Sequence, residues 1–151
     1  MASAVAIRNV TSFGLSLLFG GAVSFALAPD DSSFGANFGF YWGSQLAVLG
    51  LVLLVRPPGA ALVGVSFALA VYIALFGAWL FSQSRPDSNA WIGYVFSLPG
   101  AAMAASIASV ILRRHMQLPS TIVSSVAAIA TGAGIFLNLV AVCSTVMYCA
   151  R

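Results

Sequence analysis

Five apolar stretches, separated by short polar or turn-forming segments, dominate the pattern of this chain. The clearest is the fourth, at 91–112, which starts at Trp91 and is followed by Arg113, Arg114 and His115. At about 1.5 Å per helical residue this stretch is roughly 33 Å long, which matches the hydrocarbon core of a bilayer. It therefore predicts a transmembrane helix.

The other four apolar stretches are also long enough to span a membrane. They lie at 10–28, 38–55, 60–81 and 121–148. The connections predicted between the five spans are 29–37, 56–59, 82–90 and 117–120. In the second connection, Pro57 and Pro58 prevent a continued helix and Gly59 permits the chain to reverse. The pattern predicts an all-α, polytopic membrane bundle of about five helices in a single domain over 1–151.

The first stretch also imitates a signal peptide. It has a positive flank, an apolar core and an Ala26-Leu27-Ala28 sequence at the place of a cleavage site. We expect it to remain as the first membrane helix, because it is long enough to span and Pro29 stands where the mature chain would begin.

Arginine positions predict the orientation. An inside N-terminus places Arg8, Arg56, Arg113 and Arg114 in inner segments, and Arg85 and Arg151 in outer ones. Basic residues in short loops favour the cytoplasmic side, so we predict that the N-terminus is inside and the C-terminus outside. Arg56, Arg113 and Arg114 are the expected topology anchors. All three aspartates, including Asp87, fall in outer segments.

Composition agrees with a lipid environment. The chain is 61% hydrophobic and 6% charged, whereas a soluble domain has about 25% charged residues. Its net charge of +3 comes from arginines that are scattered along the sequence. Clustered positive charge is typical of proteins that bind nucleic acid or anionic lipid, and the scattered pattern indicates neither. The expected surroundings are the lipid bilayer.

Small residues recur at every fourth position in three spans, which favours close helix packing. The most complete row is in the fourth span, so we expect this helix to lie centrally. The rows are Ser16, Gly20, Ser24 and Ala28; Ala70, Ala74 and Ala78; and Gly93, Ser97, Ala101, Ala105 and Ser109.

The fourth span also contains Pro99 and Gly100 near its middle, and this pair predicts a kink or hinge. A kinked helix lined by Ser and Ala could border a pore or a ligand cleft. The kink could equally be a packing solution.

Polar groups within the spans are few. No Asp, Glu, Lys or Arg lies well inside any span, which argues against the buried carboxylate relay of proton-coupled transporters. Gln45 and Asn138 are the notable side chains, and we predict that they form an interhelical hydrogen bond. They serve either as structural glue or as part of a substrate site.

Aromatic residues gather at the predicted outer interface. These are Trp42, Trp79, Trp91, Tyr41, Tyr94 and Tyr148. They either anchor the protein in the headgroup region or form a docking surface. In the segment 34–42, rings alternate with Gly35, Gly39 and Gly43, which gives a closely approachable backbone; this segment could instead pack against a helix of its own chain. The candidate partner-binding residues on the outer face are Asp30, Asp31, Phe34, Phe38, Tyr41, Trp42 and Trp91.

Catalytic and metal-binding patterns are missing from the sequence. The single histidine, His115, has no acidic or cysteine residue near it in sequence, and nothing has the spacing of a metal site or a cofactor motif. We expect neither an enzyme nor a cofactor. Cys143 and Cys149 point in different directions on one helix, so a disulfide between them requires the helix to end between them. Cys143 is therefore expected to pack as an unpaired apolar residue, and the state of Cys149 is left open.

Three functional hypotheses follow. The first is a non-enzymatic protein that binds a protein partner in the membrane, as an accessory subunit or as a guard against a membrane-acting toxin. In size and compactness the chain resembles the immunity proteins that protect bacterial inner membranes from pore-forming bacteriocins, although no motif carries this likeness. The second is an oligomeric channel or facilitator for a small neutral solute. The third is a membrane-embedded enzyme completed by a partner subunit.

Overall fold

A computed structural model describes residues 2–28, 30–83, 90–115 and 117–147. These residues form helices and connections, and no strand occurs among them. The helices are α1 Ala2–Leu27, α2 Phe34–Leu53, α3 Gly59–Ser82, α4 Ala90–Arg114, α5 Ser120–Val142 and the short π-helix η1 Cys143–Met147. Each of the five long helices contains a segment long and apolar enough to cross a membrane. The predicted all-α, multi-pass bundle is confirmed. Arg85, Asp87, Tyr148, Cys149 and Arg151 lie outside the described residues.

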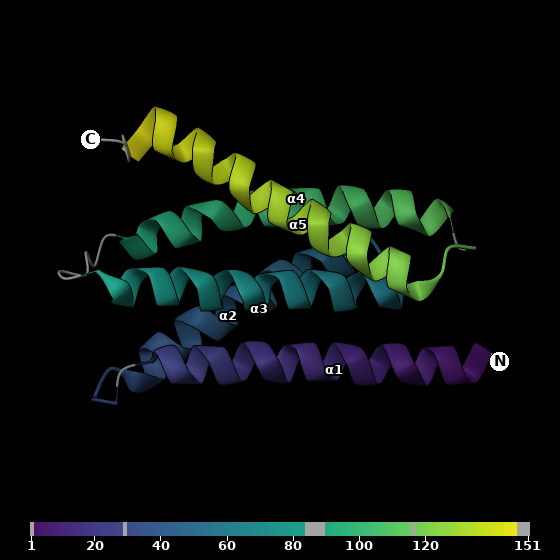
Figure 1. The fold of residues 1–151 in the computed structure, drawn as a ribbon, viewed down its shortest axis with the longest axis horizontal. Helices are drawn as coiled ribbons and strands as arrows, with labels where there is room; N and C mark the ends of the chain where they lie inside the picture. Colours follow the sequence, from purple (N-terminus) through teal and green to yellow (C-terminus); the bar gives the residue numbers. More distant parts are fainter. Residues whose placement is uncertain (1, 29, 84–89, 116, 148–151) are drawn as a thin grey trace.

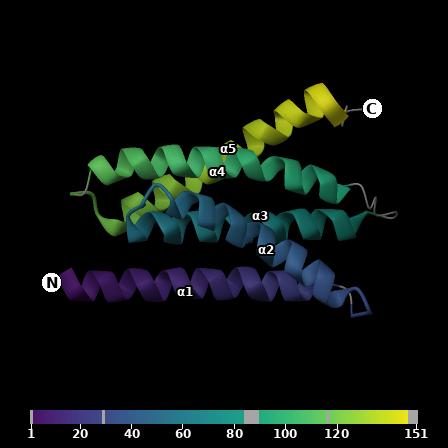
Figure 2. The ribbon, with the colours of Figure 1, turned by 180° about the vertical axis from the view of Figure 1, so that it is seen from behind.

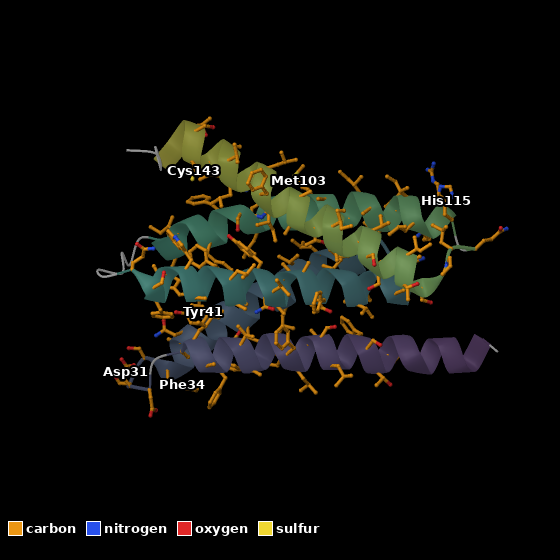
Figure 3. All side chains as sticks on the ribbon, in the orientation of Figure 1. Asp31, Phe34, Tyr41, Met103, His115 and Cys143 are labelled. Carbon is orange, nitrogen blue, oxygen red and sulfur yellow. The ribbon has the colours of Figure 1, made fainter. Side chains whose placement is uncertain are left out.

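Successive helices alternate in direction (Figure 1). The start of α1, the α2–α3 connection and the α4–α5 connection lie at one end of the bundle, which we call the basic end because it carries Arg56, Arg113 and Arg114. The α1–α2 connection and the end of α5 lie at the opposite end. We call this the acidic end, since it carries Asp30 and Asp31 (Figures 1 and 3).

Helix α3 occupies the centre of the bundle. It contacts all four other long helices, whereas α4 contacts α2, α3 and α5. The prediction that the fourth span is central is therefore wrong. Helix α3 can take this place because it has small residues on two sides, Gly64 towards α5 and Gly77 towards α1. Its Val65, Leu69 and Ile73 are almost completely buried.

Two of the three predicted small-residue rows do lie in helix interfaces. Ser16, Gly20 and Ser24 are buried in α1, and Ser97, Ala101, Ala105 and Ser109 are buried in α4. In α3, Ala70 is buried but Ala78 is exposed. Ala74, between them, is half-buried, so this row leaves the interface towards the end of α3. The buried residues of α3 include Ala61, Val65, Leu69, Ile73 and Leu80.

Helix α2 begins four residues earlier than predicted, at Phe34. The carboxylate of Asp31 accepts a hydrogen bond from the Ser33 backbone N–H at 2.7 Å, just before the first turn. At the other end of α2, the positive φ in the connection belongs to Arg56, at 52°, and not to Gly59, which was expected to permit the chain reversal. Gly59 is already the first residue of α3.

Candidate partner-binding surface

The residues predicted to contact a partner all lie near the acidic end, as Figure 3 shows for Asp31, Phe34 and Tyr41. Asp30 and Asp31 are exposed. The aromatic members, in contrast, pack against rings and helices of their own chain. Packing of this segment against its own chain was the alternative to docking that the sequence left open.

The aromatic contacts form two groups. In the first, Phe25 of α1 packs edge-on against Phe34 with ring centroids 5.1 Å apart, and Phe34 stacks on Phe38 at 6.1 Å. Trp42 follows in this group and lies against Gly21 of α1. These contacts join the halves of α1 and α2 that lie nearer the acidic end.

In the second group, Tyr41 of α2 stacks on Trp91 of α4 with centroids 4.4 Å apart. Tyr41 is only 4% exposed, so its ring is part of the core. Phe76 of α3 also contacts Trp91, at 5.2 Å. Tyr41 and Trp91 therefore hold three helices together, and a docking role for them stays a prediction.

On the side of α2 that faces away from these aromatic contacts, a row of small residues is not covered by another of the described helices. Because helical residues four apart lie on one side, this row continues along most of α2. We call it the glycine face; it consists of Gly35, Gly39, Gly43, Ala47 and Gly50. A Cβ atom added to any of its four glycines would have no heavy atom of another helix within 4 Å, as far as the described part of the chain shows. Viewed from behind, α2 lies in front of α3 and no helix lies in front of α2 (Figure 2).

Other glycines are needed for packing inside the chain. A Cβ on Gly64 would overlap the carbonyl oxygen of Ser124, and a Cβ on Gly100 would overlap that of Gly134. A Cβ on Gly20 would lie 2.6 Å from the Gln45 side-chain oxygen. The approachable backbone of 35–43 was predicted from the sequence. That its glycines share one helix face was not predicted, although their spacing of four indicates it.

The predicted hydrogen bond between Gln45 and Asn138 does not form. Gln45 Nε2 donates to Ser24 Oγ of α1 at 3.2 Å and to the Tyr41 carbonyl oxygen at 3.3 Å. Asn138 Nδ2 donates to the carbonyl oxygen of Phe96 in α4. The prediction is wrong because both residues find a partner on the neighbouring helix at their own depth, and α2 and α5 do not touch.

The predicted hinge residues lie inside a continuous helix. Helix α4 contains Pro99, and its ribbon changes direction near its middle in Figures 1 and 2. Proline has no N–H to donate, and the nearby Phe96 carbonyl is occupied by Asn138 from α5. Gly100 lies against the backbone of Gly134, so α4 and α5 come close together beside Pro99.

Three tyrosine and serine hydroxyl contacts link the centre of the bundle. Ser44 Oγ of α2 and the Tyr94 hydroxyl of α4 lie 2.9 Å apart. Ser97 Oγ lies 2.8 Å from the Tyr72 hydroxyl of α3 and 2.6 Å from the Tyr94 carbonyl oxygen. These contacts satisfy the buried hydroxyls and fix the positions of α2, α3 and α4 relative to one another.

The three predicted topology anchors meet at the basic end. Arg56, Arg113 and Arg114 are exposed there, and Arg113 Nη1 donates to the Val55 carbonyl oxygen at 3.4 Å. His115 also lies at this end (Figure 3). The contact of Arg113 with Val55 ties the end of α4 to the end of α2.

Cys143 is disulfide-bonded, so the prediction of an unpaired apolar cysteine is wrong. That prediction assumed a regular α-helix to the end of the fifth span. The α-helix ends at Val142 and the π-helix η1 starts at Cys143, so the assumed side-chain directions do not hold there. Cys143 lies towards the acidic end of the bundle (Figure 3).

Two hollows lie beside α3. An apolar groove of about 450 Å³ runs between α3 and α5, and its lining includes Phe67, Tyr72, Gly132 and Phe136. A second cavity of about 390 Å³ lies near the basic end. We call it the hydroxyl cavity; its lining is Ser12, Ala60, Val63, Ser120, Thr121, Ser124 and Ser125. Among the described residues, no three His, Cys, Asp or Glu side chains form a group that could hold a metal ion.

Comparison of the chain with protein-family models, curated proteins and solved structures gives no match. Function must therefore be inferred from the surfaces and cavities themselves.

Proposed function

We propose that this is a non-enzymatic multi-pass membrane protein that acts by binding another membrane protein, with the glycine face of α2 as the contact surface. The observation that carries the proposal is that a side chain at any of these glycines would meet no other helix among the described residues. A glycine inside a helix costs about 0.5–1 kcal/mol relative to alanine. Lipid gives no reason to retain it, whereas a closely packed neighbouring helix does.

The orientation and compartment belong to the same proposal. The arginines of the basic end favour the cytoplasmic side. Disulfides persist in oxidising compartments, and the disulfide-bonded Cys143 lies towards the opposite end. Both features support a bacterial inner membrane with the acidic end outside. There, Asp30 and Asp31 would meet the exposed part of an accessory-subunit partner or of a membrane-acting toxin.

The alternative of a solute channel or facilitator has less support. Leu69, Ile73 and Tyr94 are each at most 1% exposed and fill the centre of the bundle. A solute path would have to run between chains of an oligomer. Contact of the glycine face with another membrane protein would therefore favour partner binding, and contact with a second copy of this chain would favour the facilitator.

A photo-crosslinking experiment in the native host tests the proposal. A photoreactive amino acid at Ala47, on the glycine face, should give one predominant adduct with another membrane protein. Leu18 of α1, which is 70% exposed, is the control position and should crosslink only to lipid. The adduct should disappear when Gly39→Leu and Gly43→Leu are introduced, and persist with Gly14→Leu on α1, where a Cβ also meets open space.

An adduct consisting of two copies of this chain would replace the proposal with the oligomeric facilitator. Absence of any protein adduct from Ala47, in membranes where the chain is folded, would remove the basis for partner binding through α2.

A further inference from the structure

The hydroxyl cavity lies near the basic end of the bundle and has a largely hydroxyl-bearing lining. Five of its seven lining residues carry a hydroxyl group, and they come from α1 and α5 on either side of the start of α3. Ala60 and Val63 of α3 supply the apolar part of the wall. The cavity is therefore a polar recess between helices whose other surfaces are apolar.

The five hydroxyls have no hydrogen-bond partner among the described residues. Elsewhere in the bundle, hydroxyls bond to the carbonyl oxygen one turn earlier; Ser24 does so at 2.8 Å and Thr131 at 2.7 Å. The cavity hydroxyls leave their donors available to a bound group. A ligand with several acceptor oxygens matches this lining.

The backbone adds donors at the same place. Helices α3 and α5 both start at the cavity, after Pro58 and Pro119, and neither has a side-chain cap or an acidic residue in its first turn. The first N–H groups of a helix lack intrahelical partners and carry partial positive charge. Residues of both first turns, Ala60 of α3 and Ser120 of α5, line the recess.

The surrounding charge has the sign that suits an anion. Arg56, Arg113 and Arg114 lie at this end of the bundle (Figure 1). Asp30 and Asp31 lie at the other end (Figure 3). In the sequence these arginines are scattered, and no anionic-lipid site was predicted; the fold places the three of them at one end of the bundle.

We propose that the hydroxyl cavity binds a phosphate group, carried by the headgroup of an anionic phospholipid or present as free phosphate. Phosphate oxygens accept hydrogen bonds from hydroxyls and from helix N-terminal N–H groups. The volume of about 390 Å³ lies within the usual range of small-ligand sites. Basic recesses between membrane helices on the cytoplasmic side are typical sites for anionic headgroups. This inference does not depend on the glycine face.

Native mass spectrometry of the purified full chain in detergent tests the site with three probes. These are dioleoylphosphatidylglycerol, inorganic phosphate and dioleoylglycerol, which lacks phosphate. Retention of the phosphatidylglycerol without competition by phosphate identifies the lipid headgroup as the source, and competition by phosphate identifies the free ion. Binding of both lipids to the same extent would overturn the proposal.

Variants locate the site. Thr121→Val combined with Ser125→Ala should weaken binding of the phosphate-bearing probe at least about tenfold, since two hydrogen bonds to a charged group are lost. The matched control is Thr145→Val combined with Ser144→Ala; these hydroxyls lie beyond the opposite end of α5 and bond to the Ala141 carbonyl oxygen. Equal binding by the two double variants would place the phosphate elsewhere.

A second variant separates loss of phosphate binding from loss of folding. Ser120→Asp puts a negative charge in the first turn of α5, where it favours the helix and repels phosphate. This variant should retain its helical circular dichroism and lose binding. Undiminished binding by Ser120→Asp would contradict the site.

Discussion

Glycines in this chain differ in what lies next to their α-carbons. At Gly64, Gly77, Gly100 and Gly134 a side chain would collide with another helix, so these positions set the distances between helices. On the glycine face of α2 the same residue type meets open space. Composition alone cannot separate the two groups, because the difference lies in the neighbour and not in the residue.

Substitution of single glycines by alanine should therefore have two outcomes. Gly64→Ala should lower the free energy of unfolding by about 1–3 kcal/mol, because the added Cβ overlaps the Ser124 backbone. Gly43→Ala should leave it unchanged or raise it slightly, since alanine favours the helix. Unfolding in mixed micelles, followed by circular dichroism, measures both. Equal destabilisation would mean that α3 and α5 are not in close contact at Gly64.

At the scale of helices, the sequence predicted the elements well and their neighbours poorly. All five spans and the alternating directions follow from apolar length and the turns between them. The buried rows in α1 and α4 follow from small-residue spacing. The pairing of Gln45 with Asn138 failed because periodicity tells which side of a helix is polar or small, but not which helix lies opposite. The disulfide at Cys143 was missed because a π-helix replaces the expected α-helix there.

The observed partner of Gln45 gives an element-scale prediction for the α1–α2 pair. Gln45→Leu combined with Ser24→Ala should show a coupling energy of about 0.6–1.7 kcal/mol in a double-mutant cycle, the range of interhelical hydrogen bonds in membranes. Gln45→Leu combined with Asn138→Leu is the control and should be additive. The measurement is again unfolding in mixed micelles. If coupling were found only for Gln45→Leu combined with Asn138→Leu, the hydrogen bond between Gln45 and Asn138 would be favoured instead.

At the scale of the whole molecule, charge divides the bundle into a basic and an acidic end. If the basic end faces the cytoplasm, a reporter enzyme active only outside should work when fused after Ser33 and fail when fused after Gln117. A reporter that fluoresces only inside should show the reverse. Fusions with identical linkers and comparable membrane levels control for expression. Activity of both fusions in one compartment would contradict the alternating topology.

The central place of α3 has a consequence for how the protein is made. Ribosomes deliver α1 and α2 to the membrane first, but the main packing surface of α1 belongs to α3, with which it shares Gly77 and Leu27. The first two helices must therefore remain in the bilayer without that surface until the third is synthesised. During this interval Gln45 of α2 can already donate its hydrogen bond to Ser24 of α1, because this contact needs only the first two helices. Their hydrogen bond thus gives the nascent hairpin a defined register before the rest of the bundle exists.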